Sequence, residues 1–429
     1  MTRRLLVLLF CLVWASPAFA VPQPIMGATT VNLDDTLTET VCPMGVNGIL
    51  AGQWPCVVPA AGTFSRLCVT LFAAPQNGAG TQSYTFTVQQ SASLGTPSDT
   101  PITLTISEDD TYECDSSNTQ AVVAGDLVTL EVTPANTPAV MRAAYSLQFT
   151  PTTPGQQIWM TGLDTVTSTT ADAYFSLSRA AASATEDDRY TIFGKACTAA
   201  ALYVEVATAP DTGVGTQEYA WTTRDCGPYT AASCADTALT CTNSETARAC
   251  NGATSFSVDA EDMLTVESDP SVSAPVDPDK VAIGVRCDMA DVMTFNLAGS
   301  TTADVSTTST VFLAPNSVGA TASTTEANNQ VETHELVVTG LWVWLSADPG
   351  TSPDAYSYTV RDDAADTNCT FNIVANNTTG EKTDCADILR SPTLLSLEIS
   401  PISTPSVATM DTNWGMALQY QPRRKVVVE

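Results

Sequence analysis

The sequence predicts an all-β protein with three tandem antiparallel β-sandwich repeats, jelly-roll or immunoglobulin-like, after a cleaved signal peptide. Three observations support this prediction. The N-terminus resembles an export signal, two landmark segments recur three times, and apolar residues alternate with polar ones between short turns. No amphipathic helical pattern follows the first twenty residues.

The first twenty residues have the pattern of a secretory signal peptide. Arg3 and Arg4 precede the apolar run 5–13, and the segment ends on Ala18-Phe19-Ala20. Such a short run cannot cross about 30 Å of hydrocarbon as a helix. We therefore expect cleavage after Ala20 and a secreted protein, periplasmic or on the extracellular surface, with no membrane insertion.

Composition narrows the class further. Without residues 1–20 the chain has 15 basic and 46 acidic residues, a net charge of −31, and twelve cysteines. An even cysteine number in an exported chain predicts a disulfide framework. The strong negative charge excludes nucleic acid as a partner, because binding it requires clustered cations. A hydrophobic content of 44% excludes a disordered acidic chain.

Two landmarks define the internal repeat, and both recur in the same order. The first landmark occurs as Leu67–Pro75, Leu202–Pro210 and Leu341–Pro349. The second occurs as Leu127–Pro134, Met263–Pro270 and Leu394–Pro401. Each copy then closes on an alternating apolar segment. The predicted units are residues 21–152, 153–288 and 289–429.

The repeated segments have β character. Tyr84, Phe86 and Val88 alternate with Thr85 and Thr87, which predicts a strand with one buried face. Each unit spans about 135 residues, which suits an eight-stranded jelly roll better than a seven-stranded immunoglobulin domain of about 100 residues. The joins between units are short and contain proline, so we expect a semi-rigid row of domains.

The twelve cysteines divide as four, six and two among the three units. Cys369 and Cys385 are alone in the third unit and must pair if bonding stays within units. Cys241 and Cys250 occupy the same region of the second unit and are paired by analogy. The remaining pairs are weaker guesses: Cys42–Cys56, Cys68–Cys114, Cys226–Cys234 and Cys197–Cys287. Metal binding by cysteine is disfavoured, since no C-x-x-C pair is present and export disfavours free thiolates.

Acidic loops are candidate calcium sites, because calcium prefers six to eight oxygen ligands. The densest loop contains Asp109, Asp110 and Asp115, and similar clusters occur at 186–188 and 361–366. None has EF-hand spacing, and a solvated acidic surface is the favoured alternative. His334, the single histidine, lies between Glu332 and Glu335 in the sequence, and the alternation predicts that it is one polar residue on an exposed strand face.

Trp342 and Trp344 alternate with aliphatic residues, so they are expected to point away from the core of their own unit. Exposed aromatics can stack on sugars or anchor a partner. Burial by the neighbouring unit or by another chain is the preferred interpretation, because tandem domains must cover the faces between them.

No catalytic motif recurs in the three copies, so we expect no enzyme and no cofactor, with calcium as an open alternative. The leading hypothesis is a secreted structural or adhesive surface protein that contacts other protein subunits or surface glycans. One rival is a carbohydrate- or calcium-dependent binding module. Another is a filament or coat subunit, a homo-oligomer in which residues 21–40 pair with a neighbouring chain's sheet edge. A hydrolase would require a cleft with two facing carboxylates.

Overall fold

The computed structural model describes most of the chain after the first nineteen residues. The described residues are 20–29, 31–47, 55–76, 81–93, 95–163, 168–177, 182–211, 217–229, 234–271, 275–301, 305–316, 322–328, 330–333, 336–390, 393–405 and 410–420. They form β-strands and two short 3-10 turns, η1 (Glu186–Arg189) and η2 (Glu326–Asn328). No helix among the described residues is long and apolar enough to cross a membrane.

The first unit is a sandwich of two sheets. One has the order β3-β1-β10-β5-β8, and the other has the order β2-β9-β6-β7 with β4 also paired to β9. All pairings are antiparallel except that of β1 with β3. The strands are β1 (Gln23–Thr29), β2 (Glu39–Val41), β3 (Gly45–Asn47), β4 (Cys56–Val57), β5 (Gly62–Leu71), β6 (Ser83–Ser91), β7 (Ser98–Ser107), β8 (Tyr112–Val122), β9 (Leu127–Ala135) and β10 (Ala143–Pro151).

The second unit repeats this plan. Its sheets have the orders β11-β20-β14-β17, with β18 paired to β14, and β12-β19-β15-β16, with β13 paired to β19. The strands are β11 (Gln156–Leu163), β12 (Ala173–Phe175), β13 (Thr191–Ile192), β14 (Cys197–Val206), β15 (Glu218–Pro228), β16 (Ala235–Ser244), β17 (Ala249–Gly252), β18 (Phe256–Val258), β19 (Asp262–Pro270) and β20 (Val281–Met289).

The third unit has the same two sheets again, β21-β30-β24-β27 with β28 paired to β24, and β22-β29-β25-β26 with β23 paired to β29. The strands are β21 (Thr294–Ser300), β22 (Val311–Leu313), β23 (Val331–Thr333), β24 (Leu336–Leu345), β25 (Ala355–Asp362), β26 (Ala365–Val374), β27 (Thr379–Lys382), β28 (Asp387–Leu389), β29 (Thr393–Ile402) and β30 (Thr412–Tyr420).

The strand order distinguishes a jelly roll from an immunoglobulin-like sandwich. If the eight main strands of each unit are counted along the chain, one sheet reads 1-8-3-6 and the other reads 2-7-4-5 in all three units. This double Greek-key order is that of a jelly roll. The predicted fold class, three antiparallel β-sandwich repeats, is therefore confirmed, and the jelly-roll alternative is the one present.

Strand register confirms that the two landmarks are structurally equivalent. The first landmark lies in β5, β14 and β24, and each of these strands has a register shift against its partner close to the landmark leucine. The shift falls at Ala200 in β14 and at the equivalent Thr339 in β24, and one or two positions later in β5, at Arg66 and Leu67. The second landmark lies in β9, β19 and β29. Large side chains from both sheets fill each core, including Phe86 in the first unit and Trp221 in the second.

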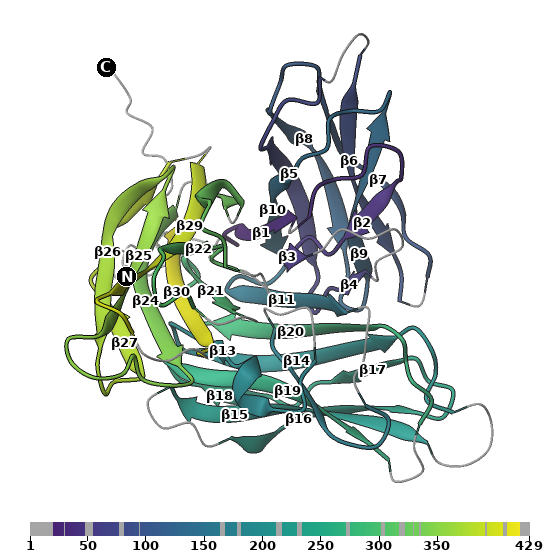
Figure 1. The fold of residues 1–429 in the computed structure, drawn as a ribbon. Helices are drawn as coiled ribbons and strands as arrows, with labels where there is room; N and C mark the ends of the chain where they lie inside the picture. Colours follow the sequence, from purple (N-terminus) through teal and green to yellow (C-terminus); the bar gives the residue numbers. More distant parts are fainter. Residues whose placement is uncertain are drawn as a thin grey trace, which may run out of the picture.

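The three units do not form the expected row. Figure 1 shows them gathered around β1, β11 and β21, so that the first unit also lies against the third. Met26, Ala28 and Ala144 of the first unit belong to the hydrophobic cluster of the third. The prediction of a row was wrong because the proline-bearing joins determine only how consecutive units are connected. Which units pack together is determined by the apolar faces of their sheets.

Residues 21–40 are also placed differently from the filament hypothesis. Gln23–Thr29 is β1, which pairs with β10 on one side and β3 on the other. Glu39 and Thr40 belong to β2, which pairs with β9. The segment thus supplies strands to its own sandwich, and Ile25 and Leu33 enter the core.

Candidate functional site: the interfaces between the units

Each unit packs one short strand on the sheet of another unit. β4 of the first unit contacts β11 and β20 of the second, β13 of the second contacts β21 and β30 of the third, and β23 of the third contacts β1 and β10 of the first. The three strands are equivalent, since each pairs with the same strand of its own unit, β9, β19 or β29. The contacts therefore form a closed ring with approximate threefold equivalence.

Each contact centres on one buried residue. By register against the second landmark, the equivalent residues are Val57 in β4, Ile192 in β13 and Glu332 in β23. The backbones approach closely at these points. A Cβ atom at Gly284 would lie 2.6 Å from the carbonyl oxygen of Val57, and one at Gly415 would lie 2.5 Å from that of Ile192. Glycine is required at both positions because a side chain would collide with main chain.

Trp342 and Trp344 lie in the contact between the second and third units. Trp342 is 2% exposed and belongs to a hydrophobic cluster with Tyr190 and Ile192 of the second unit. Trp344 is partly buried, and its ring makes an edge-on contact with Tyr190 at 5.5 Å between centroids. The alternating aliphatic residues of β24 enter the core of the third unit. The neighbouring unit thus covers the outward aromatic face.

The first and second units meet through the equivalent strand β14. Tyr203, at the position of Trp342, packs against Val57 and Leu127 of the first unit. Glu205 follows on the same face, is buried, and accepts a hydrogen bond of 3.1 Å from the Ser93 hydroxyl of the first unit. The outer face of β14 therefore contacts the first unit as the outer face of β24 contacts the second, although the residue types differ.

A glutamine contact joins the first strands of the units near the centre of the ring. The Gln23 side chain donates to the Ile158 carbonyl at 2.9 Å and accepts from its N–H at 2.8 Å. Gln157, the equivalent residue of the second unit, makes the same two contacts with the backbone of Asn296 in the third. The third copy has Phe295 at this position and would face Pro24, which has no N–H, so the contact cannot repeat there.

The contact of the third unit on the first is polar. Glu332 is fully buried, and its Oε2 accepts a hydrogen bond of 3.1 Å from Thr70. Its Oε1 has no hydrogen-bond partner. Burial raises the pKa of Glu332 to about 8, although Thr70 and the charge of Arg66 lower it in part. This residue is therefore a neutral acid at neutral pH in the closed ring.

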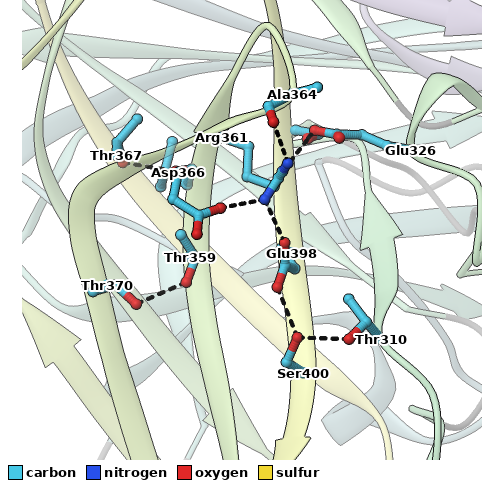
Figure 2. Close-up of polar contacts among 12 residues, drawn as sticks. Thr310, Glu326, Thr359, Arg361, Ala364, Asp366, Thr367, Thr370, Glu398 and Ser400 are labelled. Carbon is cyan, nitrogen blue, oxygen red and sulfur yellow. Dashed lines mark hydrogen bonds and ion pairs between the residues drawn. The ribbon is translucent and has the colours of Figure 1, made fainter.

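A second repeated feature is an arginine cluster on the outer sheets. Arg361 of β25 donates to Glu326 of η2 at 2.9 Å and to Glu398 of β29 at 2.7 Å. It also pairs with Asp366 and donates to the Ala364 carbonyl (Figure 2). Burial alone would lower the pKa of this guanidinium, but the surrounding carboxylates raise it above its ordinary value. The cluster fixes η2 to the sheet.

The same cluster occurs in the second unit. Arg224 binds Glu186 of η1 at 2.6 Å, Asp236 at 2.6 Å and Glu267 at 2.9 Å. In the first unit the equivalent residue is Gln89, whose amide donates to Asp99 at 2.9 Å and Glu131 at 2.7 Å. A side chain with more than one donor thus joins the same aspartate and glutamate positions in every unit.

The acidic clusters at 186–188 and 361–366 therefore contribute to ion pairs with arginine. One signal for these clusters is visible in the sequence, because an arginine occupies the equivalent position of the equivalent strand in two copies, as Thr223-Arg224-Asp225 and Val360-Arg361-Asp362. Strand register is required to see that each arginine lies diagonally across from the landmark glutamate, with which it forms an ion pair.

Asp109, Asp110 and Asp115 are not brought together as a ligand set among the described residues. Asp109 and Asp110 are exposed in the turn before β8, whereas Asp115 is buried within that strand. Its carboxylate accepts hydrogen bonds from Thr103, Ser117 and Asn118. Burial would raise the pKa of Asp115, but these hydrogen bonds lower it below its ordinary value. Protein donors thus occupy the oxygens that a calcium ion would need.

Six disulfides are present, each within one unit. Cys241–Cys250 joins β16 to β17 in the second unit, and Cys369–Cys385 joins β26 to the segment between β27 and β28 in the third. The other four are Cys42–Cys56, Cys68–Cys114, Cys197–Cys287 and Cys226–Cys234. Two clusters of potential metal ligands among the described residues each contain a disulfide, so those sulfurs are not free thiolates. His334 lies outside the described residues.

An open hollow of about 300 Å³ lies where the second and third units meet. Its lining includes Lys195, Asp291, Thr294 and Gln419, together with apolar side chains. Asp291 is the single carboxylate of that lining. The hollow therefore lacks the two facing carboxylates that glycoside hydrolysis requires.

No protein-family model matches the chain, and no curated protein matches it. Two similar solved structures come from archaeal viruses. One is a chain from the atomic structure of Sulfolobus Turreted Icosahedral Virus, with 9% identity, 84% of this chain and 79% of that chain covered, and a TM-score of 0.17. The other, described under the triple jelly roll fold and turret assembly in an archaeal virus, has 10% identity, 85% and 90% coverage, and a TM-score of 0.17. Similarity at this level carries no argument about the function of this chain.

Proposed function

We propose that this chain is an exported, non-enzymatic structural protein that acts on an outer surface as a scaffold or adhesive component. The proposal rests on one observation: the side chains that recur between the units hold the protein itself together. The tryptophans and the glutamines join the units, the arginine clusters fix turns to sheets, and the cysteines close disulfides. These roles build one rigid body, as a scaffold requires.

The coat or filament subunit is the second candidate, and the ring supports it. Three jelly rolls with equivalent contacts give one chain the approximate symmetry of a trimer. Such a body could occupy a threefold position in a regular array and present three equivalent outer sheets to neighbouring chains. In this version residues 21–40 have no role in joining chains, because they are strands of the first unit.

Electron microscopy of the mature protein over a range of concentrations tests both candidates. Regular arrays, filaments or shells would identify an assembly subunit, and separate three-lobed particles that bind a cell surface would identify an adhesive component. Separate particles that bind no surface would contradict the proposal. A glycan array with and without a calcium chelator tests the binding module: chelator-sensitive glycan binding would favour that rival, and no binding in either condition would remove it.

A further inference from the structure

The three strand contacts of the ring differ in one chemically important respect. Val57 and Ile192 place aliphatic side chains at the centre of two contacts, and Glu332 places a carboxyl at the centre of the third. All three side chains are buried. A buried charge without a partner is costly, so a carboxyl at this position changes how the contact responds to pH.

The surroundings of Glu332 do not compensate a charge well. Thr70 donates one hydrogen bond to Oε2, and Oε1 has no partner within hydrogen-bond geometry. The nearby Ser146 hydroxyl makes the smallest contribution to lowering the pKa of Glu332. A carboxylate oxygen lies within 4.8 Å of both sulfurs of the Cys68–Cys114 disulfide, which do not titrate. The titratable groups that face it are Arg66 on β5 and Tyr112 on β8. The Arg66 charge favours the carboxylate but does not overcome burial.

We propose that the contact between the third and first units is linked to proton binding: the ring closes there with uptake of one proton by Glu332, and the contact weakens as the pH rises. This inference goes beyond the proposed structural role and does not depend on it.

The sign follows from the two states of the carboxyl. In the closed ring the pKa of Glu332 is raised from 4.5 to about 8 by burial. When the units separate, the carboxyl enters water and its pKa returns to the ordinary value. Between these two values closing takes up one proton, so the closing constant falls about tenfold for each pH unit. The closing constant is largest at acid pH, falls as the pH rises to about 8, and changes no further above that pH. Its total decrease is roughly three orders of magnitude.

A second interface has one carboxyl, that of Glu261, whose pKa is also raised. Glu261 of the second unit and Glu381 of the third lie together beside Trp342 and Tyr229. Burial first, and then the charge of Glu381, raise the pKa of Glu261. Each contact of the third unit therefore contains one carboxyl whose pKa is raised, Glu332 in one and Glu261 in the other.

Hydrogen–deuterium exchange of the mature full-length chain tests the proposal, with rates corrected for the intrinsic effect of pH. Wild type is compared with Glu332→Gln, which stays neutral, and with Glu332→Ile, which copies Ile192. Protection of β23 and of the facing strands β1 and β10 should fall about tenfold per pH unit in wild type, relative to either variant, between about pH 5 and about pH 8. Glu113→Gln, an exposed residue on β8, should follow wild type.

A ratio of wild-type to variant protection that stays constant across this range would overturn the proposal. If neither variant folds, as judged by circular dichroism at acid pH, the equivalent strand β4 serves as an internal reference in wild type. Protection of β23 that does not fall relative to β4 as the pH rises would likewise overturn it.

Discussion

Cys68, Tyr203 and Trp342 occupy one equivalent position on the outer face of β5, β14 and β24. One forms a disulfide, and the other two pack against a neighbouring unit. The alternation of β24 was enough to predict that Trp342 points away from its own core. It could not predict which unit covers the ring, because that depends on strands far away in the sequence.

Trp342 lies on the outer face of its own unit but is buried by the second unit, so Trp342→Ala should be strongly destabilising. The substitution removes a side chain that is 2% exposed and leaves a cavity beside Tyr190 and Ile192. We expect a loss of about 3–5 kcal/mol in the free energy of unfolding, measured by urea denaturation. Val374→Ala, at a residue that is 49% exposed, is the control and should change stability by less than about 0.5 kcal/mol. An equal effect of the two changes would contradict the buried interface.

Arg361→Met should destabilise the third unit because Glu326 and Glu398 would lose their cationic partner and keep only hydrogen bonds from serine hydroxyls. We expect a cost of about 1–3 kcal/mol, measured by thermal unfolding. Arg286→Met removes a single pair with Asp288, whose side chain is 39% exposed, and should cost no more than about 1 kcal/mol. If the Arg361 change costs no more than the Arg286 change, the cluster does not hold η2 to the sheet.

At the scale of elements, the first strands of the units show how local sequence produces a contact between units. Gln23 and Gln157 lie at equivalent positions near the start of β1 and β11, and each binds the backbone of the next unit's first strand. The third copy has Phe295, and its partner position has Pro24, so both halves of the contact are missing together. The glutamine contact thus joins only units that are consecutive in the chain. The contact between the third and first units, which closes the ring, is made without it.

Gln157→Leu tests this contact. The change leaves the buried N–H and carbonyl of Asn296 without their side-chain partner, which should cost about 1–3 kcal/mol in urea denaturation. Gln156→Leu alters the preceding residue, which is only partly buried, and should have a small effect. A Gln157 variant as stable as the Gln156 variant would show that the glutamine contact contributes nothing.

Much of the fold could be predicted at this scale. The period-two pattern of Tyr84 and Phe86 indicated strands, and the two landmarks indicated three copies with equivalent strands. The arginine clusters were not predicted, because Arg361 and Glu398 meet only once β25 is paired with β29. Asp115 was grouped with Asp109 by proximity in the sequence, yet strand geometry turns it towards donors of its own unit.

At the scale of the whole molecule, the closing contact separates a ring from a row. Short joins with proline connect the first unit to the second and the second to the third, which either arrangement satisfies. The contact of β23 with β1 and β10 joins residues more than a hundred positions apart, and no periodic pattern in the sequence indicates it. It depends on complementary surfaces, so the pattern of one chain could not reveal it.

Small-angle X-ray scattering of residues 21–429, measured on the single-chain species, tests the ring most directly. A compact body of this length should have a radius of gyration of about 22 Å. Three domains of about 14 Å each, placed end to end, should give roughly 30 Å or more. The ring predicts the smaller value and a compact scattering profile at acid pH. A radius near the larger value under those conditions would contradict the closed arrangement of the three units.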